Sequence, residues 1–175
     1  MKPCSLFIFL LLITASSSYG QSITFNTNAY PGIWNNEHTG YYYGGGGIEL
    51  YYEHAINEGA LLTGFEIRAV DWGNQISVGI GYKVPYMVKD RWTISRTIAA
   101  NLGMALFHDN PLFVYSLDAG TIFTWAPEKR FSFDAGIRLR FTHCPAYRNY
   151  GTINQLIEFP LTIGVRLKLG QLDLK

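Results

Sequence analysis

The sequence predicts an all-β protein: an eight-stranded antiparallel up-and-down barrel that spans a membrane, with a polar, charge-paired lumen and short turns. Three observations lead to this prediction. Apolar and polar side chains alternate with a period of two residues in segment after segment, which is typical of strands with two different faces. Short turn sequences separate these segments. Charged residues fall on one strand face or in the turns, with a single exception.

The N-terminal segment, residues 1–20, has the composition of an export signal. Lys2 is basic, Leu6–Ala15 forms an apolar core, and Ser18 and Gly20 place small residues before a cleavage site. The apolar core is about half as long as the ~20 residues that a membrane-spanning helix needs. We therefore expect a cleaved signal peptide at 1–20 and a barrel domain at 21–175.

The remaining chain divides into eight expected strands joined by turns. Turn chemistry is clearest in 57–59, 71–74, 89–91, 108–111 and 126–130, where Gly, Pro, Asn and Asp gather. Connections this short make neighbouring strands antiparallel. The expected strands are Ser22–Tyr30, Tyr42–His54, Ala60–Val70, Gln75–Tyr86, Trp92–Phe107, Leu112–Trp125, Phe131–His143 and Gln155–Leu169.

Volume and charge decide which face points outward. An eight-stranded barrel has an interior only just wide enough for side chains to fill, so the large apolar set does not fit inside it. The other face carries small residues and equal numbers of acids and bases, which permits buried charges to pair. The predicted lumen charges are Glu49, Glu53, Glu66, Arg68, Lys83, Asp118, Asp134, Arg138, Arg140, Glu158, Arg166 and Lys168.

Arg96 is the one charged residue on the apolar face. Two explanations remain open: its side chain snorkels to the headgroups, or a bulge between Ala99 and Ala100 shifts the register. Aromatic residues gather at both ends of the strands, as in the belts at membrane interfaces. These residues are Tyr86, Trp92, Trp125 and Phe131 at one end and Trp72, Phe107, Phe113 and Phe141 at the other.

The last expected strand carries the residues on which a family resemblance rests. The stretch Thr162–Leu169 is similar to the terminal β-signal of bacterial outer-membrane proteins, with Leu169 where the family usually has an aromatic residue. The chain thereby resembles the small eight-stranded OmpA/OmpX-like barrels of Gram-negative bacteria. This resemblance implies an outer-membrane location, contact with lipid and lipopolysaccharide, and recognition by the barrel-assembly machinery. The implied assembly residues are Thr162, Gly164, Leu167 and Leu169.

The resemblance favours a structural or surface-interaction role without catalysis. A narrow or closed lumen disfavours a general porin. In the implied orientation the extracellular loops are about 31–40, 71–74, 108–111 and 144–154, and an extracellular ligand stays unidentified. Candidate surface contacts, of types common at binding hot spots, are Trp34, Tyr147, Arg148 and Tyr150.

Two other classes stay open. A lipid A-modifying enzyme needs a Ser, His and carboxylate that meet, but the expected register puts His143 and Glu158 on opposite faces, and Pro145 occupies the position of the deacylase-like Ser. A secreted soluble barrel or sandwich that binds a ligand requires the apolar face inside. The sequence suggests no metal, cofactor or nucleic-acid site, because it lacks a Cys cluster, a phosphate-binding loop and a basic patch.

Overall fold

A computed structural model describes residues 21–31, 44–70, 73–107, 110–146 and 155–169. The described chain is almost entirely β-strand, and none of it forms a helix that is long and apolar enough to cross a membrane. The strands are β1 (Gln21–Pro31), β2 (Gly44–Ile56), β3 (Gly59–Val70), β4 (Gly73–Lys89), β5 (Trp92–Phe107), β6 (Asn110–Trp125), β7 (Phe131–His143), β8 (Gln155–Glu158) and β9 (Leu161–Leu169).

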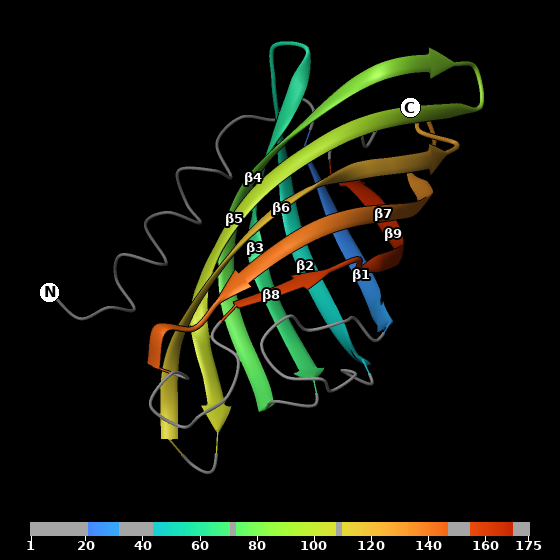
Figure 1. The fold of residues 1–175 in the computed structure, drawn as a ribbon. Helices are drawn as coiled ribbons and strands as arrows, with labels where there is room; N and C mark the ends of the chain where they lie inside the picture. Colours follow the sequence, from blue (N-terminus) through green and yellow to red (C-terminus); the bar gives the residue numbers. More distant parts are fainter. Residues whose placement is uncertain (1–20, 32–43, 71–72, 108–109, 147–154, 170–175) are drawn as a thin grey trace, which may run out of the picture.

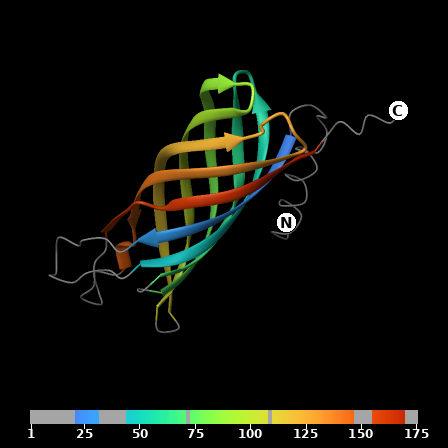
Figure 2. The same ribbon diagram turned by 90° about the vertical axis from the view of Figure 1, so that its right-hand side faces the viewer.

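The strands form one closed antiparallel barrel. Each pairs with its neighbours in the chain from β1 to β7, and β7 pairs with both β8 and β9. Pairing of β1 with β9 closes the sheet, and Figure 2 shows blue β1 between β2 and β9. Because β8 and β9 are two parts of one strand, the predicted eight-stranded up-and-down barrel is confirmed.

The strands run obliquely around the barrel axis (Figure 1). When the pairs are followed once around the wall from Leu167 in β9, the path passes Ile23, Tyr52 and successive partners. It returns to the same strand at Ile157, not at Leu167. This stagger obliges the strands to tilt, so residues distant along the chain reach the same height in the lumen.

Several strand ends differ from expectation by one or two residues, and two differences are larger. β4 extends from Gly73 to Lys89, beyond the expected Gln75–Tyr86. The expected last strand is interrupted at Phe159 and Pro160, because proline has no N–H to donate to the ladder. Its carbonyl nevertheless accepts a hydrogen bond from Arg138 N at 3.0 Å, so the wall stays continuous.

A β-bulge lies in β4, not in β5. Pro85 pairs with Ser95 and Met87 pairs with Ile94, so Tyr86 is the extra residue. The pairing of β5 with β6 runs without a break from Trp92 to Phe107. The explanation of Arg96 by a bulge between Ala99 and Ala100 is therefore wrong, and Arg96 lies on the outer face.

The two chain ends of the barrel, Gln21 and Leu169, lie at one end together with the β2–β3, β4–β5 and β6–β7 connections, and this end is here called the termini end. The opposite end, called the loop end, has the ends of β1 and β2 at Pro31 and Gly44. At the termini end a two-residue turn joins Ile56 to Gly59, and Asn57 adopts a φ of 53°, a left-handed conformation that asparagine tolerates well.

The two faces of the wall differ sharply in chemistry. The outer face exposes a continuous set of large apolar side chains, including Val78, Ile98 and Ile163 at 57%, 63% and 70% exposure. The inner face buries mostly polar and charged ones. A water-soluble β-barrel would show the opposite arrangement, so the outer face has the chemistry of a surface in contact with lipid.

Candidate functional site in the barrel lumen

The lumen contains eleven of the twelve charged residues expected there, each in at least one ion pair. Lys168 is the exception. Its side chain is 39% exposed and lies 3.8 Å from Glu128 in a turn at the termini end, so it belongs to the rim. The buried set has six acids and five bases, not the equal numbers expected. The eleven are Glu49, Glu53, Glu66, Arg68, Lys83, Asp118, Asp134, Arg138, Arg140, Glu158 and Arg166.

Arg140 is the centre of the network. Its Nη1 donates to both carboxylate oxygens of Glu66, at 2.6 and 2.8 Å, while Nε and Nη2 donate to Asp118 at 2.5 and 2.8 Å. Glu66 comes from β3 and Arg140 from β7, which have three strands between them in either direction around the wall. The Arg140–Glu66 ion pair therefore spans the lumen from one side to the other.

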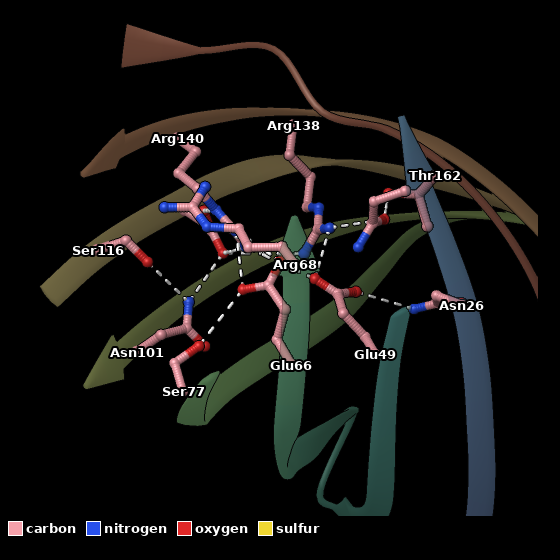
Figure 3. A network of polar contacts seen from close by, with 12 residues as sticks. Asn26, Glu49, Glu66, Arg68, Ser77, Asn101, Ser116, Arg138, Arg140 and Thr162 are labelled. Atoms are coloured by element: carbon pink, nitrogen blue, oxygen red, sulfur yellow. Dashed lines mark hydrogen bonds and ion pairs between the residues drawn. The ribbon is translucent and has the colours of Figure 1, made fainter. Parts of the chain in front are cut away.

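Arg138 lies two residues earlier on the same face of β7 and forms a second ion pair across the lumen. Its Nη2 donates to Glu49 at 2.7 Å and to Asn28 at 2.9 Å. Figure 3 shows Arg138 and Arg140 of β7 converging with Glu49 of β2 and Glu66 of β3. Together these pairs form the central layer, which we define as Glu49, Glu66, Asp118, Arg138 and Arg140.

A second group lies toward the loop end. Arg68 donates to Glu158 at 2.6 Å, to Gln75 at 2.7 Å and to Thr142 at 3.3 Å. Tyr30 donates to Glu66, and its ring lies 5.4 Å from the Arg68 guanidinium carbon and 5.6 Å from that of Arg140. A buried apolar cluster of Leu112, Val114 and Cys144 is packed at this end of the lumen.

The termini-end layer consists of Glu53, Lys83, Asp134 and Arg166. Lys83 Nζ donates to the Glu53 carboxylate at 2.9 and 3.1 Å, and Arg166 Nη2 donates to both oxygens of Asp134 at 3.0 Å. Arg166 Nε also lies 3.5 Å from Glu53, which links the two pairs. The Glu53, Lys83 and Arg166 side chains retain slightly more exposure than those of the central layer, whereas Asp134 is as buried as Asp118.

A cavity separates the central and termini-end layers. Its wall includes charged groups from both layers and apolar residues such as Leu62, Ala99 and Ile122. Asn26 Oδ1, Thr97 Oγ1 and Arg138 Nε belong to residues that line it, and each is buried without a hydrogen-bond partner in the protein. Such atoms are normally satisfied by ordered water, so the cavity has the chemistry of a hydrated chamber.

Glycines make room for the large lumen side chains. Gly64 is paired with Tyr51, and Gly120 with Arg138. A Cβ at Gly120 would lie 2.6 Å from Arg138 Cγ and 2.8 Å from its Cα, so any side chain there would displace the arginine. The glycines of the polar face thus leave space for the side chain of the paired residue on the neighbouring strand.

Several polar residues of the network were not predicted as site residues. Tyr30, Asn28 and Asn101 each bridge to a charged group, as do Thr24 and Thr124. The signal that would have found them is their position on the same face of the strands as the charges. Charge alone was too narrow a criterion, because neutral donors complete the hydrogen bonding of buried carboxylates.

The predicted assembly residues lie in the last strand, β9. Thr162 is buried and donates to Asn28 at 2.8 Å, whereas Leu167 and Leu169 lie at the end of β9, and Gly164 is paired with Asn26. The candidate surface residues Trp34, Tyr147, Arg148 and Tyr150 lie outside the described residues.

The structure does not bring together His143 and Glu158, the residues considered for a lipid A-modifying enzyme. Glu158 is fully buried in the lumen, while the His143 ring packs against Tyr115 and Phe141, with centroids 5.2 and 6.5 Å away. The pairing of β6 with β7 places these three rings on the outer side of the wall, away from Glu158. Among the described residues, no group of His, Cys, Asp and Glu is arranged to hold a metal ion.

Of the comparisons with known proteins, the one with solved structures supports the fold. No protein-family model and no curated protein sequence matches the chain. Among solved structures, it is similar to Neisserial surface protein A, with a TM-score of 0.65 and 13% identity over 87% of this chain and 99% of that one. It is also similar to Ail, the attachment invasion locus protein of Yersinia pestis, with a TM-score of 0.53 and 14% identity over 85% and 99%. The fold is that of the small eight-stranded outer-membrane barrels.

Proposed function

We propose that this chain is an outer-membrane barrel with a closed lumen and a structural or surface-interaction role. The observation that carries the proposal is the pairing of an apolar outer wall with the Arg140–Glu66 ion pair that crosses the lumen. The wall suits lipid, and the crossing pairs leave no wide path for solutes. Residues 1–20 direct export and are removed in this proposal.

The surface role rests on the loop end of the barrel. The names of two similar structures describe a surface protein and an attachment and invasion protein. Here the contacting residues would be Trp34, Tyr147, Arg148 and Tyr150, in segments that follow β1 and β7. Lipopolysaccharide surrounds this end of the wall, and the barrel-assembly machinery reads Thr162, Gly164, Leu167 and Leu169 during insertion.

Two measurements test the proposal. The protein extracted from an outer-membrane fraction should change its gel mobility on boiling, because a closed barrel resists detergent until it is heated. In planar bilayers it should give little or no conductance. Residence in a soluble fraction would refute the membrane location, and steady open channels would refute the closed lumen while leaving the barrel intact.

A further inference from the structure

Arg96 occupies an unusual position on the outer wall. Among the described strand residues between the hairpin ends, it is the only Arg, Lys, Asp or Glu whose side chain faces outward, and it is exposed. Every other arginine within the strands, namely Arg68, Arg138, Arg140 and Arg166, points into the lumen and pairs with a carboxylate. An outward guanidinium next to lipid is costly unless it meets an anion.

The β4 bulge supplies a specific neighbour for this guanidinium. Tyr86 is the extra residue between the Pro85 and Met87 pairs, and it faces outward at 49% exposure. Its ring lies 4.9 Å from the Arg96 guanidinium carbon, within the range of a cation–π contact. Bulges commonly re-aim one side chain, and here the bulge adds an aromatic platform beside the charge.

The height of Arg96 on the wall identifies the kind of anion. It pairs with Val84 and Thr121 and lies four residues after Trp92, where β5 begins at the termini end. At ~3.3 Å per residue along a strand tilted by about 40°, this places its Cα roughly 10 Å from the strand end. A long side chain snorkels over that distance toward the interface, in the direction of Tyr86.

We infer that Arg96 and Tyr86 form a binding site for the phosphate of a glycerophospholipid in the leaflet at the termini end. The guanidinium donates to the phosphate oxygens, the Tyr86 ring holds the guanidinium in place, and Ile98 and Val84 contact the acyl chains. Charge complementarity selects the phosphate, since the outward-facing strand residues around it provide no carboxylate. This inference rests on the proposed membrane location.

Lipid retention in native mass spectrometry tests the site. The full chain would be reconstituted in vesicles of phosphatidylethanolamine and phosphatidylglycerol, then extracted in a non-ionic detergent. We expect the wild-type protein to keep a bound phospholipid and Arg96→Leu to bind it about tenfold more weakly, as for loss of a charge-assisted hydrogen bond. Tyr86→Leu should weaken retention less, and Arg96→Lys should retain an intermediate amount.

Arg130→Leu, in the exposed turn before β7, is the matched control and should retain phospholipid like the wild type. Equal retention by Arg96→Leu and the wild type would overturn the site. An equal loss in Arg130→Leu would also overturn it, because general attraction to the headgroups would then explain the binding. Should Arg96→Leu fail to fold, Arg96→Lys and Tyr86→Leu decide the same question.

Vesicle flotation separates this inference from the proposed function. Wild-type protein that does not float with the vesicles would refute the membrane location, and the site with it. Wild-type protein that floats but shows no dependence of lipid retention on Arg96 or Tyr86 would refute the site alone.

Discussion

The central and termini-end layers of the lumen use the same kinds of side chain in different surroundings. In the central layer Arg140 has no exposed side-chain surface and its donors reach Glu66 and Asp118 directly. In the termini-end layer Lys83 and Arg166 keep 7% and 11% exposure, and a cavity with unpartnered polar atoms lies beside them. We therefore expect ion pairs of similar length to contribute differently to stability, according to whether water can replace a lost partner.

The largest effect is expected for Arg140→Met. This change leaves the Glu66 and Asp118 carboxylates buried without their main partner, and removing one member of a buried pair costs about 3–5 kcal/mol. The free energy of unfolding, measured by urea titration in detergent micelles, should fall by that amount. Arg140→Lys keeps the charge but loses the forked geometry, so it should recover part of the loss. A wild-type value for Arg140→Met would contradict the importance of the central layer.

Gly120→Ala should have the next largest effect, because its Cβ would meet the Arg138 side chain and backbone. Overpacking of this kind costs roughly 1–3 kcal/mol. Ala119→Val is the control, since Ala119 is adjacent in β6 but faces outward. The same urea titration should show the loss for Gly120→Ala only, and equal losses would mean that Gly120 does not seat Arg138.

Lys83→Met should cost less than the Arg140 change, about 1 kcal/mol, at the low end of the cost of an unsatisfied buried group. Glu53 keeps Thr24 at 2.7 Å and Arg166 at 3.5 Å, and water in the cavity can solvate the freed oxygen. The difference between the Lys83 and Arg140 variants in parallel titrations measures the contrast between the layers. Equal losses would mean that the cavity is not hydrated.

Lys168→Gln at the rim should have the smallest effect. Its partner Glu128 is 83% exposed, and solvent screens such a pair strongly. The change in the free energy of unfolding should stay within about 0.5 kcal/mol. A larger loss would show that Lys168 participates in the lumen network after all.

The alternation of apolar and polar residues was sufficient to predict where the strands lie and which face of each strand points outward. Ile157, Phe159 and Leu161 show why: alternation across a pleated strand assigns each side chain to a face before any partner is known. Strand ends were less predictable. The extension of β4 to Lys89 depends on a bulge at Tyr86, and the break at Pro160 was hidden by a pattern that continued through it.

The sequence did not allow us to predict which lumen charges pair with one another. Arg140 and Glu66 are separated by 74 positions along the chain, and Arg68 and Glu158 by 90. Their meeting depends on the stagger of the whole barrel, which brings opposite strands to one height only after the sheet has closed. Lys168 shows the same limit, since its face was predictable but its height at the rim was not.

The sequence by itself therefore determined the strands, the apolar outer wall and the charged inner face, because these follow from a two-residue period and from the cost of burying charge. The tertiary structure alone decided which acid meets which base, where the cavity lies, and that the bulge sets Tyr86 beside Arg96. These features depend on contacts between strands. The physical reason is that residues of different strands come to lie at the same level along the barrel axis only when the barrel closes with its particular stagger.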